Sequence, residues 1–170
     1  MLLKSKNIAY LGVLLALNQV FIFLSSVIET NTLVFFMLAA LMVGVVIVEF
    51  GVKNGILFYI ASSILGFFLT ANQTEIITYI LFFGLYSIVK YAIEKVAFPM
   101  KHARIFEVAV KLLFFNISIV IIYLLMKSII TIKLYWWLIL GAQIIFIAYD
   151  YAFSTFINYY INKIQAKIKR

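Results

Sequence analysis

The sequence predicts an all-α membrane protein with six transmembrane helices and both termini in the cytoplasm. Of its residues, 66% are hydrophobic and only 12% are charged, whereas soluble proteins carry about 25% charged residues. Apolar runs recur along the whole chain, each long enough to cross a hydrocarbon core of about 30 Å as a helix. They do not alternate apolar and polar residues as the strands of a membrane β-barrel would. We therefore expect one six-helix membrane domain over residues 1–170.

Short polar or glycine-containing segments separate the six predicted spans. ETNT, ANQTE and KSIITIK form the outer turns after the first, third and fifth spans. At the inner turn after the second span, Gly51 and Gly55 flank Lys53, and glycine tolerates the positive φ of a tight turn. The only proline, Pro99, marks the longest inner loop, which separates four spans from two. The six spans lie near residues 8–28, 32–50, 54–71, 76–93, 105–126 and 134–157.

The positions of lysine and arginine predict the orientation of the chain. With both termini in the cytoplasm, twelve of the 14 basic residues lie on the inner side, and only Lys127 and Lys133 lie outside. Basic loops favour the cytoplasmic side of a membrane. The net charge of +8 is then mainly an orientation signal with affinity for anionic membrane lipid. We expect a multi-pass protein of the cell membrane with no nucleic-acid partner.

The residue types argue against an enzyme. Cysteine is absent and His102, in the inner loop, is the only histidine, so we expect neither a thiolate metal site nor a bound cofactor. Catalysis inside a membrane typically needs paired acids, histidines or an activated serine. Ser62, Ser63 and Ser118 are explained more simply as serines that pack between helices.

Asp150 lies in the last long apolar stretch, QIIFIAYDYAFSTFINYY, where a charged group costs about 2.5–3.5 kcal/mol or more. The rise of a helix per residue puts Lys90, Lys111 and Asp150 in one inner layer, with Glu94 and Glu107 just beneath. We interpret the three charges as a structural ion cluster that joins the last three spans. Each lysine also has an acid one helical turn away on its own helix, which could pair with it instead. A gating or proton-relay role for Asp150 stays open.

Polar residues recur at helical spacing on four of the spans and lead toward the outer side. They predict a ligand cavity that opens to the exterior. Interfacial aromatic belts and hydrogen bonds between helices are the alternative interpretation. The candidate substrate-binding residues are Glu29, Asn72, Glu75, Tyr79, Tyr86, Asn116, Tyr123, Trp136 and Gln143.

Small residues form a second stripe on the inner half of the first span, at Ala9, Gly12 and Ala16. Small residues about one turn apart allow helices to approach closely in lipid. We expect this face to dock a neighbouring span or another protein.

Residues 32 to 70, TLVFFMLAALMVGVVIVEFGVKNGILFYIASSILGFFLT, resemble the second and third spans of a known family, and FGLYSIVKYAIEK resembles the end of its fourth span. That family is the substrate-binding S components of energy-coupling factor (ECF) transporters, which take up vitamins and related micronutrients. The resemblance covers about half of the chain. It implies six helices, cytoplasmic termini, and a substrate held near the outer face by outer loops and the last three spans.

The resemblance also implies partners. In the family, an alanine-x-x-x-alanine motif on the first span packs against a membrane coupling subunit, and here Gly12 and Ala16 match it, with glycine as a departure. Nothing resembles an ATP-binding loop, so separate ATPase subunits would hydrolyse ATP. Glu29 and Glu75, among tyrosines and tryptophans, would suit a small planar or cationic substrate. The alternative is a scaffold similar to the six-span bacterial cell-shape protein, although the acidic residue common after that group's third span is missing.

Overall fold

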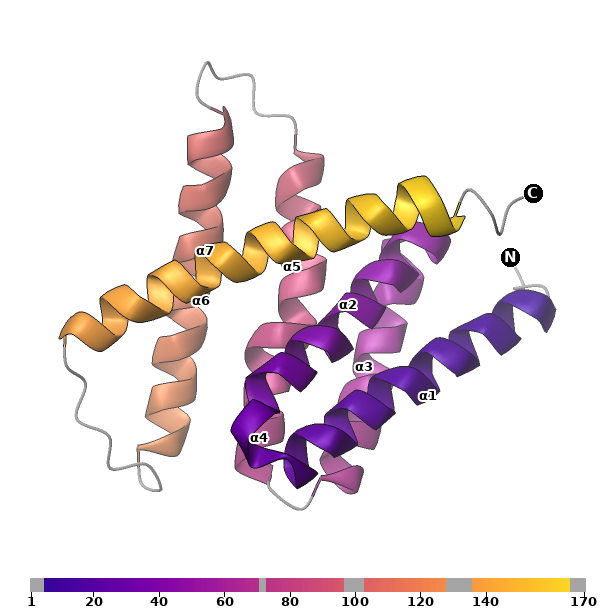
Figure 1. Cartoon of the computed structure of the whole chain (residues 1–170), viewed down its shortest axis with the longest axis horizontal. Coiled ribbons are helices and arrows are strands. Elements are labelled where there is room, and N and C mark those ends of the chain that lie inside the picture. Colours follow the sequence, from indigo (N-terminus) through magenta and orange to yellow (C-terminus); the bar gives the residue numbers. More distant parts are fainter. Residues whose placement is uncertain (1–4, 71–72, 97–102, 128–135, 166–170) are drawn as a thin grey trace. The chain divides into compact units, whose positions relative to one another are not determined.

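The structure, a computed structural model, describes residues 5–70, 73–96, 103–127 and 136–165 (Figure 1). Every secondary-structure element in these ranges is helical. The elements are α1 (Ser5–Val27), η1 (Glu29–Asn31), α2 (Thr32–Phe50), α3 (Val52–Leu69), α4 (Gln73–Thr78), η2 (Tyr79–Gly84), α5 (Leu85–Lys95), α6 (Ala103–Met126), α7 (Trp136–Tyr159) and η3 (Tyr160–Gln165).

Six helical segments in the described ranges are long and apolar enough to cross a membrane, which confirms the predicted fold class. The fourth consists of α4, η2 and α5, and the sixth consists of α7 and η3. The sixth helix continues to Gln165, eight residues past its predicted end at 157, because falling hydropathy marks where a span leaves the lipid and not where its helix stops. The inside–outside orientation stays a prediction, but six crossings would put both chain ends on one side.

The helices group into two compact units, residues 1–88 and 89–170. The boundary falls inside α5, so the first turn of that helix belongs to one unit and the rest to the other. Pro99, the expected divider between four spans and two, lies outside the described residues.

The centre of the first unit is α2. Nine of its 19 residues are buried, and α1, α3 and η2 all pack against it (Figure 1). The buried set includes Ala39, Ala40 and Gly44, whose small side chains let neighbouring backbones come close. The Phe36 ring lies 5.8 Å from the ring of Tyr79 and 5.9 Å from that of Phe83, so aromatic contacts fix η2 on α2.

The turn between α2 and α3 depends on two glycines with different tasks. Gly51 has φ +82°, a backbone conformation that L side chains rarely adopt, and its N–H still donates to the Ile47 carbonyl at 2.9 Å. This confirms the positive φ expected of a glycine at this turn. Gly55 lies directly against the Ile47 side chain, and an added methyl group would overlap it. One glycine therefore makes the turn and the other lets the two helices touch.

A π-helical turn, η2, interrupts the fourth span. Here Gly84 packs against Tyr59 of α3, and a Cβ at this glycine would come within 2.8 Å of the tyrosine ring. The Tyr59 hydroxyl donates to the Ile80 carbonyl at 2.8 Å. The π turn is thus held in place by a side chain from a neighbouring helix.

In the second unit, α7 crosses α6 (Figure 1). The rings of Phe115 and Phe146 stack at the crossing, with centroids 4.5 Å apart and planes 13° from parallel. Around this stack lie an ion cluster and a cavity.

Candidate functional site

Buried polar side chains link the helices of the first unit. Asn18 of α1 donates from Nδ2 to the Ala39 carbonyl at 2.8 Å and to the Tyr79 hydroxyl at 3.1 Å. That hydroxyl shares a hydrogen bond of 3.0 Å with the Ser62 hydroxyl. Asn18, Ser62 and Tyr79 are all fully buried. One network therefore connects α1, α2, α3 and η2.

Two further side chains extend this pattern. Gln19 donates from Nε2 to the Asn18 Oδ1 at 3.0 Å and to the Ser62 carbonyl at 3.1 Å. Ser87 donates to the Ala40 carbonyl of α2 at 2.8 Å. In the first unit, the predicted substrate-binding residue Tyr79 is thus used in hydrogen bonds between helices, which is the interpretation that the sequence left as an alternative to a cavity.

The remaining candidates of the first unit lie in different settings. Tyr86 is fully buried, with its ring 5.8 Å from that of Phe82. Glu29 is exposed at the start of η1, and Glu75 is half-buried in the first turn of α4. Asn72 lies outside the described residues. For these residues a role in substrate binding stays a prediction.

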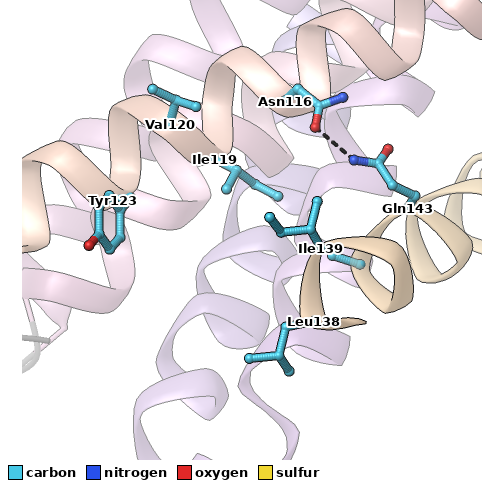
Figure 2. Close-up of a pocket in the computed structure, with 8 residues that line it drawn as sticks. Asn116, Ile119, Val120, Tyr123, Leu138, Ile139 and Gln143 are labelled. Atoms are coloured by element: carbon cyan, nitrogen blue, oxygen red, sulfur yellow. Dashed lines mark hydrogen bonds between the residues drawn. The ribbon is translucent and has the colours of Figure 1, made fainter. Parts of the chain in front are cut away.

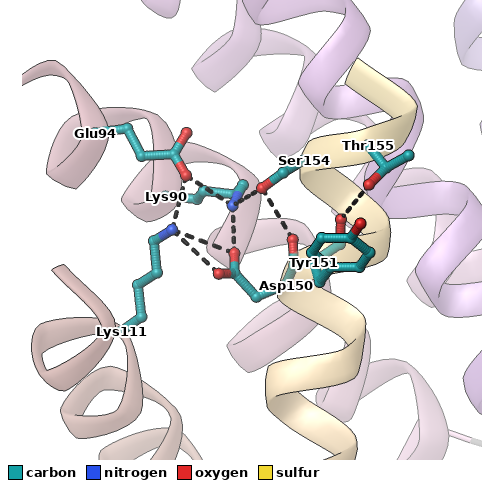
Figure 3. Close-up of polar contacts among 7 residues, drawn as sticks. All are labelled: Lys90, Glu94, Lys111, Asp150, Tyr151, Ser154 and Thr155. Carbon is teal, nitrogen blue, oxygen red and sulfur yellow. Dashed lines mark hydrogen bonds and ion pairs between the residues drawn. The ribbon is translucent and has the colours of Figure 1, made fainter. Parts of the chain in front are cut away.

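The second unit brings the three intramembrane charges together (Figure 3). Lys90 of α5 forms an ion pair with Asp150 of α7, and Lys111 of α6 contacts the same carboxylate at 3.2 Å. Glu94 completes a quartet, because its Oε1 lies 2.8 Å from the Lys90 Nζ and 2.7 Å from the Lys111 Nζ. Ser154, one turn after Asp150, accepts a hydrogen bond from Lys90 at 2.8 Å.

The quartet of Lys90, Glu94, Lys111 and Asp150 is electrically neutral, with two cations and two carboxylates. The lysine side chains are only 4% and 5% exposed, whereas Glu94 is 41% exposed, so the cluster reaches the surface at Glu94. A buried charge without a partner is costly, and pairing makes its burial tolerable. The quartet is therefore a clasp that joins α5, α6 and α7.

Sequence reasoning placed Glu94 beneath this layer and allowed that it pairs with Lys90 of its own helix. It does pair with Lys90 one turn away, but it also bridges to Lys111 on another helix. Sequence reasoning did not place Ser154 in this cluster. Its position four residues after Asp150, where the hydroxyl lies over the same helical face, was the signal that could have placed it in the cluster.

A cavity of about 410 Å³ lies between α6 and α7 (Figure 2). Three of the predicted substrate-binding residues, Asn116, Tyr123 and Gln143, line it. The stacked rings of Phe115 and Phe146 hold the helices together immediately beside Asn116. The other lining residues are Ile119, Val120, Leu138, Ile139 and Ala142.

The two amides of the cavity lie together at one end. Gln143 donates from Nε2 to the Asn116 Oδ1 at 2.7 Å, and Asn116 donates from Nδ2 to the Leu112 carbonyl at 2.8 Å. Figure 2 shows this amide pair at one end and Tyr123 at the other, with Ile119 between them and Ile139 and Leu138 on the α7 side. The arrangement can hold a mainly apolar molecule and orient it by hydrogen bonds at one end.

Trp136, the first residue of α7, is 73% exposed and is not among the lining residues. In the first unit, the docking stripe lies on an exposed face of α1, where Ala9, Gly12 and Ala16 are all exposed. A Cβ at Gly12 would meet nothing within 4 Å. This face is therefore open to lipid or to a partner helix.

Among the residues that the structure describes, no group of three or more histidine, cysteine or acidic side chains could hold a metal ion. Comparison with known proteins adds no functional evidence. No protein-family model, no curated protein and no solved structure matches the chain.

Proposed function

We propose that this chain is the substrate-binding subunit of an ECF-type uptake transporter for a vitamin or related micronutrient, and that the cavity between α6 and α7 holds the substrate. The observation that carries the proposal is the cavity of about 410 Å³ with Asn116, Tyr123 and Gln143 in its wall. Small-molecule sites are typically about 300–1,000 Å³, mainly apolar, with a few polar groups that fix orientation.

The predicted topology supports an entrance from outside. Tyr123 lies near the outer end of α6, and Leu138 lies near the outer end of α7, so the tyrosine end of the cavity is nearer the exterior. The exposed small-residue face of α1 supports the proposal that a partner protein binds there. A coupling transmembrane subunit would pack on Gly12 and Ala16, and separate ATPase subunits would provide the energy for transport.

A thermal-stability screen tests the proposal. The purified protein in detergent is heated with each water-soluble vitamin in turn. A true ligand at 100 times its dissociation constant adds about 2.7 kcal/mol to the free energy of unfolding, which is a shift of several degrees in Tm for a domain of this size.

Two variants show whether the ligand occupies this cavity. Ala142→Trp fills the cavity from its own wall and should abolish the shift. Ala148→Trp makes the same change at an exposed position of α7 outside the lining and should leave the shift intact. If no vitamin stabilises the unmodified protein, the proposal fails and the scaffold alternative, a protein without a small-molecule ligand, is favoured.

A further inference from the structure

The chemistry of the cavity wall restricts the class of ligand. A primary amide offers two N–H donors and two acceptor lone pairs, and the contacts within the protein use only part of this capacity. Gln143 gives one N–H to Asn116, and Asn116 gives one N–H to the Leu112 carbonyl. The Gln143 bond to Asn116 uses Nε2. Within the described ranges, no protein group donates a hydrogen bond to the Gln143 Oε1. The pair therefore presents a donor and an acceptor side by side.

The cavity has a definite long direction. Asn116 and Tyr123 are seven residues apart on α6, which is two helical turns, or about 10.5 Å at 1.5 Å per residue. Both residues line the cavity, with hydrocarbon side chains between them (Figure 2). A ligand that contacts both ends has an apolar or aromatic body about two helical turns long.

Electrostatics excludes a charged ligand from this space. None of the lining residues carries a charged side chain. Of the charges near the cavity, Lys111 and Asp150 are neutralised within the quartet, and Lys127, one turn past Tyr123, is exposed and is not part of the wall. An ion buried against this wall would lose its hydration without gaining a counter-charge.

We propose that the α6–α7 cavity takes an uncharged, elongated molecule with an amide-type edge, which is an adjacent donor and acceptor as in a primary amide, lactam or imide. This inference rests on the proposed function. The edge pairs with Asn116 and Gln143, and the body lies along Ile119 and Ile139 toward Tyr123. A planar cation, the class suggested by Glu29 and Glu75, is not a ligand of this cavity.

Two matched pairs of probes test the class: nicotinamide with nicotinate, and riboflavin with riboflavin 5′-phosphate. The first pair changes the edge and the charge together on a single ring, whereas the second changes the charge and keeps the imide edge of an elongated molecule. Each compound is titrated against the protein, and its dissociation constant is obtained from the shift in Tm. We expect the uncharged member of at least one pair to bind roughly a hundredfold more tightly, because burying an ion is costly.

Variants locate the edge. Gln143→Leu keeps the approximate size of the side chain and removes its donor and acceptor, so it should weaken the uncharged probe about tenfold or more. Ile144→Leu, at an exposed position of α7 outside the lining, is the control and should change the affinity little. The Tm of each variant without probe shows whether it is folded. Tyr123→Phe provides a second variant at the other end of the cavity.

The outcomes separate this inference from the proposed function. Tighter binding of the anionic members overturns the inference and leaves the proposed function standing. Binding that Ala142→Trp abolishes but Gln143→Leu does not affect has the same consequence. Binding seen in micelles and lost in phosphatidylcholine nanodiscs identifies an acyl chain as the occupant and overturns the inference. If none of the four probes binds, the inference fails, whereas the proposed function is decided by the full vitamin screen.

Discussion

Asp150 is stable in an apolar helix because two lysines meet it there. Lys90 and Lys111 are almost completely buried, and each contacts both Asp150 and Glu94. No member of the quartet is tolerable alone in this setting, but the four together carry no net charge. Tyr79 makes the same point without charge, since its buried hydroxyl bonds to Asn18 and Ser62. These polar residues are partnered by residues from other helices.

Asp150→Asn should destabilise the protein by about 3–5 kcal/mol, because it leaves two buried lysines with only the partly exposed carboxylate of Glu94. Unfolding in mixed micelles with increasing SDS measures the change. Thr155→Val, at an exposed position on the same helix (Figure 3), is the control and should cost little. A loss below about 1 kcal/mol for Asp150→Asn would show that the quartet does not hold the helices.

At the scale of elements, glycines in these helices differ in what surrounds them. Gly84 ends the π turn η2 and touches the rings of Tyr59 and Tyr79, whereas a Cβ added at Gly141 in α7 would meet nothing within 4 Å. The same residue type therefore serves close packing in one helix and has no packing role in the other. The sequence does not distinguish the two, because both lie in apolar runs.

Gly84→Ala should lower Tm, since its methyl group would come within 2.8–2.9 Å of the Tyr59 ring and force that ring to move. Gly141→Ala should keep or raise Tm, because alanine favours a helix by up to about 1 kcal/mol over glycine and has room here. Circular dichroism during heating measures both variants. Equal effects would mean that Gly84 is not a contact between helices.

The exposed face of α1 makes a second prediction at this scale. Gly12→Leu should leave the isolated chain folded, because a Cβ at this position meets nothing within 4 Å, but should prevent a coupling subunit from approaching. Affinity purification from the native membrane measures which subunits stay bound. Ala109→Leu, at an exposed position of α6, is the matched control, and equal recovery of partners with both variants would refute docking at Gly12.

At the scale of the whole molecule, six crossings and the distribution of basic residues predict one orientation. Lys53 lies in α3 directly after the turn at Gly51, and Lys127 directly follows α6. The predicted topology puts these two exposed residues on opposite sides of the membrane. The proposed substrate entrance and the proposed docking face of α1 both depend on this orientation.

The chain has no cysteine, so a single introduced cysteine reports its own side of the membrane. With a membrane-impermeant maleimide, Lys127→Cys should react in intact cells, and Lys53→Cys should react only after the membrane is opened. Both positions are exposed at helix ends, so neither change should disturb packing. Labelling of Lys53→Cys in intact cells would show that the true topology is the reverse of the predicted one, with the cavity entrance on the cytoplasmic side.

The sequence by itself determined the fold class, the number of spans and the layer of charge around Asp150, because hydropathy, helical rise and the spacing of charges are local properties of a chain. Only the tertiary structure decided which polar residues face a cavity. Tyr79 and Asn116 lie on similar polar stripes, yet Tyr79 is bonded inside the first unit and Asn116 lines a cavity in the second. The reason is that a stripe specifies one face of a helix, whereas the partner of that face, and the gap left between them, depends on side chains far away in the sequence.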